Sequence, residues 1–313
     1  MKKIYSHEPV LLHEVIQGLA IKPAGIYVDA TFGRGGHSRS ILDLLDDKGF
    51  LLALDKDPEA VLSVGEKLQQ DKRFAIEQGT FSELLHMAEK HQLIGKVDGI
   101  LLDLGVSSPQ LDNPNRGFSF LKDGPLDMRM DTTTGMDAAT WLNSAKGSQI
   151  AEILKLYGEE PMARRIANAI VVERVKQPIL TTLHLASIVR AVKPSRERDR
   201  GKHPATQTFQ AIRIFINKEL DELKHVLEQS LELLAVSGRL VVISFHSLED
   251  RIVKRFIRLH EGGDIYPFKL PIQHAQIQPR LRSVRRVMKP SIKEITSNPR
   301  ARSARLRIAE KLV

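Results

Sequence analysis

The stretch Gly25-Ile-Tyr-Val-Asp-Ala-Thr-Phe-Gly33-Arg34-Gly35-Gly36-His37 determines the fold class of this chain. It begins with a short apolar run and ends in a cluster of glycines, which predicts a buried strand that turns sharply into a helix over residues 36–46. Glycine permits such a turn and lets the backbone approach a ligand without interference from a Cβ atom. The free N–H groups of the following helix would point at an anionic group of that ligand.

Three further apolar strands follow, with helical segments between them. The strands are predicted at Phe50–Asp55, Arg73–Glu77 and Val97–Gly105. One helix begins at Pro58, with Asp57 as its N-cap, and runs to about Gln70. A second covers Ser82–Gln92. Short apolar strands that alternate with helices are typical of a parallel sheet covered on both faces, so the sequence predicts a doubly wound α/β fold.

This alternation stops after the fourth strand. Residues 137–192 have helical patterns with no strand between them, and a fifth strand follows only at Arg239–Phe245. We therefore predict a helical domain, residues 110–205, inserted into an α/β domain of residues 1–109 and 206–313.

Two segments near the C-terminus and one long helix complete the predicted fold. Val284–Lys289 and Ala304–Glu310 are expected to pair as an antiparallel edge of the sheet. Thr206–Leu234 predicts one long amphipathic helix, whose apolar face either packs within the chain or forms a homodimer.

Composition excludes several classes of protein. The 313 residues include no cysteine, so a disulfide scaffold, a thiolate zinc site and a cysteine nucleophile are all excluded. The eleven histidines show no metal-ligand spacing, and no metal is expected. The first residues are charged rather than apolar, and no apolar run approaches the roughly 20 residues of a membrane span. We expect a soluble cytoplasmic protein that makes no membrane contact.

The net charge of +9 is unevenly distributed. Residues 1–156 hold 17 basic and 22 acidic side chains, a net charge of −5, whereas residues 157–313 hold 30 and 16, a net charge of +14. From Arg280 to Arg307 there are ten basic residues and one acid, Glu294, and residues 190–202 add six basic and two acidic residues. Such asymmetry favours a nucleic acid as partner of the second half, although a solvated basic tail is the alternative.

An acidic residue at the end of the second strand indicates a nucleoside cofactor. Asp55 lies twenty positions after Gly35, where a carboxylate can accept both hydroxyl groups of a ribose. The dinucleotide fingerprint G-x-G-x-x-G is not met, because Ser38 occupies the third glycine position. The pattern fits S-adenosylmethionine better than NAD, and a tight turn without a ligand is the remaining alternative. Phe81 after the third strand, which could also be a core residue, and Asp103 after the fourth are expected to face the same crevice.

Several long motifs resemble those of one family. They are Asp103-Leu-Gly-Val-Ser-Ser-Pro-Gln-Leu-Asp112, Arg116-Gly-Phe-Ser-Phe120, Gly124-Pro-Leu-Asp-Met-Arg-Met130, His203-Pro-Ala-Thr-Gln-Thr-Phe-Gln210, Ile243-Ser-Phe-His-Ser-Leu-Glu-Asp-Arg251 and Asn298-Pro-Arg-Ala-Arg-Ser303. Together with His7-Glu-Pro-Val10 they resemble the MraW (RsmH) family, bacterial methyltransferases that modify N4 of a cytidine in 16S ribosomal RNA.

The resemblance implies a cofactor, a substrate and a set of binding residues. It implies a Rossmann-like, S-adenosylmethionine-dependent methyltransferase sheet with an inserted helical domain, acting on 16S rRNA of the small ribosomal subunit. The residues that it assigns to the cofactor are Gly35, Gly36, His37, Asp55, Phe81, Asp103 and Gln110.

Methylation of a cytosine amine requires acceptors that orient the amine and take its proton. Amino-methyltransferases generally carry a (Ser/Asp/Asn)-Pro-Pro-aromatic segment after the fourth strand, whereas this chain has Ser107-Ser108-Pro109-Gln110. The candidate catalytic residues are Asp103, Ser108 and Asp127. Phe118 and Phe120 are the candidates for stacking on the base. Methylation of pyrimidine C5 would need a cysteine, which the chain lacks.

Three polar residues are further candidates for substrate contacts. Arg116 and Arg129 could hold phosphate groups or form salt bridges within a turn, and His246 could contact the substrate or be a structural histidine. Rival functions are a nicotinamide-dependent dehydrogenase, a non-catalytic RNA-binding or ribosome-assembly factor, and a DNA amino-methyltransferase.

Overall fold

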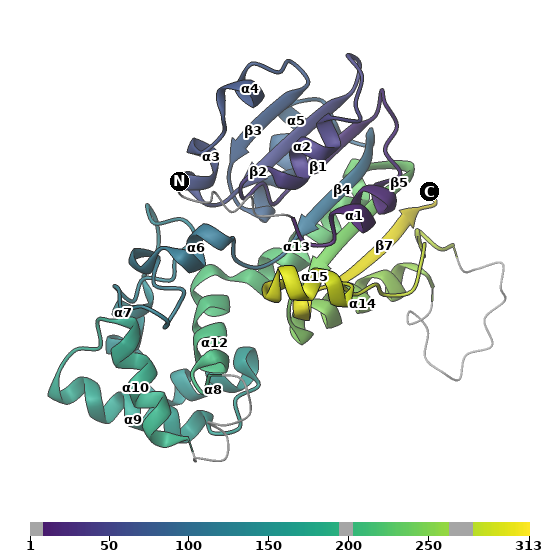
Figure 1. The fold of residues 1–313 in the computed structure, drawn as a ribbon. Coiled ribbons are helices and arrows are strands. Elements are labelled where there is room, and N and C mark those ends of the chain that lie inside the picture. The colour runs from purple at the N-terminus through teal and green to yellow at the C-terminus, as the bar shows by residue number, and fades with distance from the viewer. Residues whose placement is uncertain (1–8, 194–202, 263–277) are drawn as a thin grey trace, which may run out of the picture. The chain divides into compact units, whose positions relative to one another are not determined.

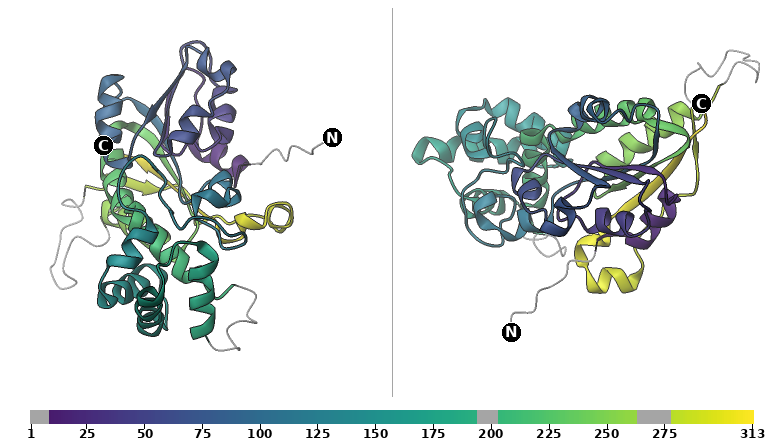
Figure 2. Two further views of the ribbon diagram at one scale, coloured as in Figure 1. Left: turned by 90° about the vertical axis from the view of Figure 1, so that its left-hand side faces the viewer. Right: turned by 90° about the horizontal axis from the view of Figure 1, so that it is seen from above.

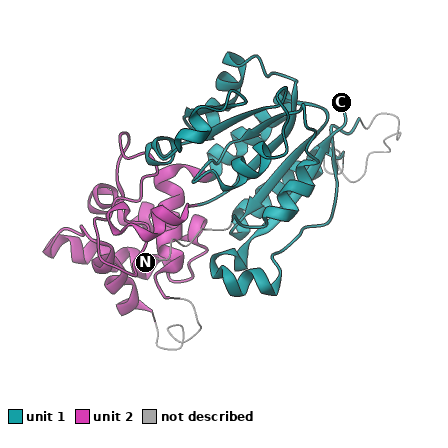
Figure 3. Ribbon diagram, turned by 45° about the horizontal axis from the view of Figure 1, so that its top comes forward, with its two compact units in different colours: residues 1–105, 220–313 teal, residues 106–219 magenta. Residues whose placement is uncertain are grey.

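The computed structural model describes residues 9–193, 203–262 and 278–313. The chain divides into two compact units, residues 1–105 with 220–313 and residues 106–219 (Figure 3). The two units are described separately below. The predicted insertion covers residues 110–205, whereas the second unit also includes the residues up to 219.

The first unit is built on a seven-stranded sheet (Figure 1). Its strands are β1 (Ile26–Asp29), β2 (Phe50–Asp55), β3 (Phe74–Gln78), β4 (Val97–Asp103), β5 (Leu234–Ser244), β6 (Leu281–Ser283) and β7 (Arg305–Lys311). They lie in the order β3-β2-β1-β4-β5-β7-β6. The first five are parallel, and β7 pairs antiparallel with both β5 and β6. The predicted doubly wound α/β fold is confirmed.

Both faces of this sheet are covered by helices, as Figures 1 and 2 show. The helices of the first unit are α1 (Leu12–Leu19), α2 (Gly36–Leu42), α3 (Pro58–Leu62), α4 (Glu66–Gln69), α5 (Leu84–Lys90), α13 (Glu219–Leu233), α14 (Ser247–His260) and α15 (Ile292–Ser297). Side chains alternate between the faces of a strand. Thus Ile100 and Leu102 of β4 pack with α5, α13 and α14, whereas Leu101 packs with α1 and α2. Two separate apolar cores therefore hold the central strands.

Two helices that the sequence predicted as continuous are interrupted. Asp57 caps α3 by accepting from the Glu59 N–H at 2.9 Å, as predicted, but the helix ends at Leu62 and α4 is a separate turn. The predicted long helix is wrong, because Lys218 has a left-handed conformation with φ of 54° and divides it into α12 (Thr206–Asn217) and α13. Each half buries its apolar face within the chain. The amphipathic pattern therefore gives no support for a homodimer.

The C-terminal edge of the sheet differs from the prediction in its residues. The strand that pairs with β7 is β6 at Leu281–Ser283, and the predicted partner segment 284–289 contributes only a bridge between Met288 and Leu306. Within the described residues, no helix is long and apolar enough to cross a membrane.

The second unit is helical around a single core. Its helices are α6 (Ser108–Asp112), α7 (Ala138–Ser144), α8 (Gly147–Gly158), α9 (Ala163–Lys176), α10 (Thr182–Val192) and α12. In the part of this unit that the structure describes, the β structure is one isolated bridge between Pro125 and Thr181. The chain's single tryptophan, Trp141, lies in the core of this unit and is 8% exposed.

A buried ion pair joins two loops of the second unit. Lys193 Nζ lies 2.7 Å from Glu160 Oε2, and their side chains are 4% and 0% exposed. Lys193 also donates to Gln207 Oε1 at 3.4 Å. Two charges without solvent depend on each other, because either one alone would be an uncompensated buried charge.

We expect Lys193→Met to destabilise the second unit by about 3 to 5 kcal/mol, since it leaves the Glu160 carboxylate without its cation. Urea unfolding followed by Trp141 fluorescence measures this change. Adding Glu160→Gln should recover much of the loss, and Lys176→Met, at an exposed pair with Glu173, should leave the midpoint nearly unchanged. Equal midpoints for Lys193→Met and Lys176→Met would contradict the expectation.

Candidate active site

Three carboxylates mark the carboxyl edge of the parallel sheet. Asp29, Asp55 and Asp103 are the last residues of β1, β2 and β4, which are adjacent strands. Ligands of open α/β sheets bind at this edge, in the crevice beyond the strand ends. The two predicted strand-end positions, Asp55 and Asp103, therefore lie on either side of Asp29.

The glycine loop between β1 and α2 is fixed by backbone hydrogen bonds. Phe32 N–H donates to Leu54 O at 2.8 Å, and Gly33 N–H donates to Asp55 Oδ2 at 2.7 Å. Gly33 and Gly35 have φ of 55° and 70°, which other residues adopt only with strain. A Cβ atom on Gly35 would also lie 2.7 Å from the Phe32 ring. The loop thus requires glycine here.

The Asp29 carboxylate is the anchor of this loop. It is 1% exposed and accepts from Ser38 Oγ at 2.6 Å and from Thr31 N–H at 3.1 Å. Burial raises the pKa of Asp29. Ser38 occupies the position at which a dinucleotide-binding loop has its third glycine, and its hydroxyl group ties α2 to the end of β1. Serine replaces the third glycine of the fingerprint here because its hydroxyl group holds the loop in place.

The Asp55 carboxylate holds the backbone of two loops and still has lone pairs available for a ligand. Its carboxylate accepts from the Gly33 and Asp57 N–H groups at 2.7 and 2.8 Å. Burial raises the pKa of Asp55 to about 6. An ionised carboxylate offers about four lone-pair sites, so two remain for the hydroxyl groups of a ribose.

His37, which is buried, and Asp103, which is half-buried, form a polar pair with unused hydrogen-bonding capacity. His37 Nε2 lies 3.6 Å from Asp103 Oδ2, and His37 is 5% exposed. Among the described residues, both ring nitrogens of His37 and Asp103 Oδ1 are buried without a hydrogen-bond partner. Buried polar atoms are nearly always satisfied, so unsatisfied ones beside a glycine loop indicate a ligand with polar groups.

A family model described as the MraW methylase family matches residues 4–312. The chain belongs to the MraW methylase family.

Individual relatives cover almost the whole chain. Ribosomal RNA small subunit methyltransferase H of Legionella pneumophila (strain Paris) is 55% identical over 306 residues, which are 98% of this chain and 99% of the relative. The protein of the same name from Coxiella burnetii (strain RSA 493 / Nine Mile phase I) is 56% identical over 307 residues, with the same coverage of 98% and 99%. The crystal structure of a rRNA methylase from Streptococcus thermophilus matches with a TM-score of 0.41 and 11% identity, over 96% of this chain and 94% of that chain.

Membership of the MraW methylase family confirms that the chain is a methyltransferase, and its methyl donor is S-adenosylmethionine. The dehydrogenase alternative is wrong. The residues of the first unit fit this cofactor, because Asp55 has lone pairs for the ribose while His37 and Asp103 offer unsatisfied groups for the ammonium and carboxylate of its methionine end.

Phe81 begins the 3₁₀-helix η1 (Phe81–Glu83) after β3 and is half-buried against the apolar core, so part of its ring is already used in packing.

Two of the predicted site residues of the second unit, Gln110 and Asp127, have structural partners. Gln110 is buried and accepts from Ser107 N–H at 2.8 Å in a capping box of α6. Asp127 accepts from Arg129 Nε and Nη2 at 2.9 and 2.7 Å. This is the turn-stabilising alternative predicted for Arg129, and it occupies both oxygens of Asp127. Ser108 is the first residue of α6 and is half-buried.

Arg116 and the two candidate stacking residues also have internal contacts. Arg116 is 4% exposed and donates to the Arg129 and Met130 carbonyl oxygens at 3.1 and 2.8 Å. Phe118 is 6% exposed in the core of the second unit. Phe120 is half-buried and stacks on His203, with ring centroids 4.3 Å apart. Of the two phenylalanines, only Phe120 retains substantial exposed surface.

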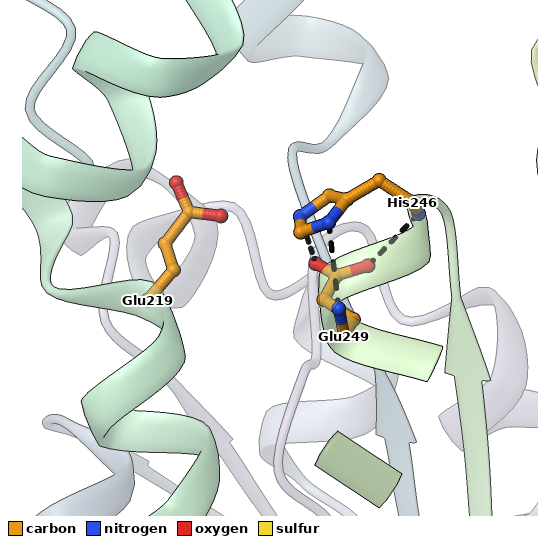
Figure 4. A group of neighbouring side chains, drawn as sticks. All are labelled: Glu219, His246 and Glu249. Carbon is orange, nitrogen blue, oxygen red and sulfur yellow. Dashed lines mark hydrogen bonds and ion pairs between the residues drawn. The ribbon is translucent and has the colours of Figure 1, made fainter. Parts of the chain in front are cut away.

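His246 is the N-cap of α14 and contacts Glu249, as Figure 4 shows. Its Nδ1 accepts from the Glu249 N–H at 3.4 Å, and its Nε2 lies 3.0 Å from Glu249 Oε1. Glu219, also drawn there, belongs to the second unit and pairs with Arg213 at 2.7 Å. The capping contacts support the structural alternative for His246.

Sequence reasoning missed the residue that connects the strand ends. Thr31 Oγ1 accepts from the Asp103 N–H at 2.7 Å and donates to Asp29 Oδ1 at 3.3 Å. The sequence did contain one indication of this role: Thr31 follows the strand-end residue Asp29 by two positions, a spacing at which a side chain often hydrogen-bonds in a turn.

The affinity for S-adenosylmethionine should fall about tenfold between pH 7 and pH 5, because Asp55, whose pKa is about 6, then takes up a proton and loses the charge that holds the ribose. Titration calorimetry at both pH values measures the change. Asp55→Asn should bind more weakly but with little pH dependence. Wild-type affinity that is equal at both pH values would refute the ribose contact.

Proposed function

We propose that this chain transfers a methyl group from S-adenosylmethionine to the exocyclic N4 amine of a cytidine in 16S rRNA of the small ribosomal subunit. The observation that carries the proposal is the His37–Asp103 pair at the carboxyl edge of a methyltransferase sheet, in which both ring nitrogens of His37 and Oδ1 of Asp103 are buried without a hydrogen-bond partner among the described residues. The relatives, named small subunit rRNA methyltransferases, support the substrate. Such a substrate implies a cytoplasmic location with the ribosomes.

The absence of cysteine supports an amine as the acceptor. Methylation of pyrimidine C5 generally proceeds through a cysteine adduct at C6, and this chain has no cysteine. Transfer to an amine needs no covalent nucleophile. It needs the amine held in line with the sulfonium methyl group and an acceptor for the proton that leaves.

The three candidate catalytic residues differ in what their side chains can still accept. Both oxygens of Asp127 bind Arg129, whereas Asp103 Oδ1 has no partner among the described residues. We assign Asp103 to the cofactor and retain the Ser108 hydroxyl as the group that orients the amine. The target base must leave any stack to reach the methyl group, which favours an unpaired or extruded nucleotide.

Asp103→Asn should weaken S-adenosylmethionine binding by at least about tenfold, because a hydrogen bond to a charged group is worth about 1.5 to 3 kcal/mol. At saturating cofactor, kcat should return to within a few fold of wild type. A loss of more than about a hundredfold that persists at saturation would instead make Asp103 the acceptor of the amine proton.

The reaction is tested on small ribosomal subunits from a strain that lacks this protein. After incubation with S-adenosylmethionine and digestion of the RNA, mass spectrometry should find N4-methylcytidine at one new position. A preparation that binds the cofactor and yields no methylated nucleoside would refute the ribosomal assignment, and the same assay on free RNA and DNA would then follow. RNA binding without turnover would favour an assembly factor.

A further inference from the structure

Eight of the ten cations between Arg280 and Arg307 fall into two groups. Three of the ten are used inside the first unit: Arg305 and Arg307 bind the Asp250 carboxylate at 2.8 and 2.7 Å, and Arg282 binds Glu310 at 2.8 Å. The pKa of Asp250 is lowered; burial opposes this change, and the hydrogen bonds from Arg307 and Arg305 outweigh it. These three arginines stabilise the strands around β7 and are not available as a group for a partner.

Five other cations of this segment are exposed and, among the described residues, have no ion pair. They are Arg285, Arg286, Lys289, Lys293 and Arg302. All five lie between β6 and β7, in a stretch that includes α15 and the 3₁₀-helix η4 (Pro299–Ser303). Like charges gathered on a short exposed stretch repel each other, so the cluster gives the free protein no stability.

Strand register places residues 289–304 of this stretch, with Lys289, Lys293 and Arg302, at the carboxyl edge of the sheet; Arg285 and Arg286 lie just before, alongside β7. Arg305, the first residue of β7, pairs with Ser244, the last residue of β5. The preceding segment enters from the other direction, since Val284 N–H donates to Ile308 O and Met288 bridges Leu306. Residues 289–304 therefore lie beyond the same strand ends as Asp103, where the yellow helix α15 is drawn in Figure 1.

The single acid of the segment anchors it next to the glycine loop. Glu294 Oε1 accepts from the Leu11 N–H at 2.7 Å, and Leu11 has a left-handed conformation with φ of 53°. Pro9, two residues earlier, packs on the loop so closely that a Cβ atom on Gly36 would lie 2.4 Å from its Cγ. The cationic stretch is thus connected to the cofactor loop through a short, buried piece of chain.

We propose that Arg285, Arg286, Lys289, Lys293 and Arg302 form a docking surface for the phosphate backbone of the RNA substrate; this inference rests on the proposed function. The five cations, called here the C-terminal cation cluster, bind the phosphates of the nucleotides next to the one that enters the active site. Such contacts supply affinity and orientation without reading sequence. The binding releases the counterions condensed on the RNA, which makes it dependent on salt.

The test compares two variants that each remove four positive charges. The first carries Arg285→Gln, Arg286→Gln, Lys289→Gln and Lys293→Gln. The control carries Lys48→Gln, Lys67→Gln, Lys90→Gln and Lys96→Gln, which are exposed cations of the same unit without an ion pair among the described residues. Lys48 and Lys96 precede β2 and β4 and so lie at the opposite edge of the sheet. Affinity for small ribosomal subunits is measured from 50 to 300 mM salt.

The cluster variant should bind subunits more weakly, and the slope of log affinity against log salt should be smaller by about 3, at about 0.7 to 0.9 for each lost contact. Its KM for subunits should rise, while its kcat and its affinity for S-adenosylmethionine stay near wild type. The control should keep the wild-type slope within about 1. Equal losses in the two variants would overturn the proposal, because net charge rather than a surface would then explain them.

Failure of the proposed function gives a different result. Wild-type protein that binds subunits without methylating them would refute the function, and the difference between the two slopes would still decide the docking surface. Wild-type protein that binds neither subunits nor free 16S RNA would refute both.

Discussion

The buried carboxylate of Asp29 is the interaction on which the rest of the site depends. A carboxylate with 1% exposure is costly unless its lone pairs are satisfied, and here Ser38 and Thr31 satisfy them. Those two residues lie at the two ends of the glycine loop. Thr31 also accepts from the Asp103 backbone, so one carboxylate fixes the loop, the start of α2 and the end of β4. A cofactor that binds between these elements meets a preformed surface.

The distribution of charge matches the two ligands of the reaction. The donor carries a sulfonium cation and an ammonium group, and the sheet edge offers it the strand-end carboxylates of Asp55 and Asp103. Burial raises the pKa of Asp55 to about 6, so its ionised form has a cost in free energy that a ligand donating hydrogen bonds or positive charge can offset. The RNA is a polyanion, and the unpaired cations of the first unit's C-terminal part lie outside the sheet, on an exposed stretch. Acids therefore lie at the strand ends, and the exposed cations of this stretch lie outside them.

The central strands β1, β2 and β4 could be predicted from the sequence because each is a short apolar run that ends in an aspartate. The breaks at Ser63–Gly65 and at Lys218 could not, because apolar periodicity continues across both of them. The roles of single polar residues were harder to predict from the sequence than the helix breaks. Asp127–Arg129 and His246–Glu249 are pairs close in sequence, and a pair of this kind looks the same whether it closes a turn or faces a substrate. The Glu294–Leu11 contact spans 283 positions, and no local pattern indicates it.

A cation that already binds a carboxylate or a carbonyl group of the protein contributes less to RNA binding than a cation without an internal partner. Arg116 and Arg129 hold carbonyl groups and a carboxylate of their own loop, and Arg213 binds Glu219, so these arginines of the second unit stabilise that unit before any substrate arrives. Arg305 and Arg307 do the same for β7. A phosphate could compete for such a guanidinium only by breaking a short hydrogen bond to a carboxylate or carbonyl, which costs about as much as the new contact gains. Cations without an internal partner carry no such cost. The five residues of the C-terminal cation cluster carry no such cost, whereas Arg282, Arg305 and Arg307 of the same segment do. Basic composition counts all ten residues of the segment equally, and it therefore overstates the number of cations that the segment can offer to RNA.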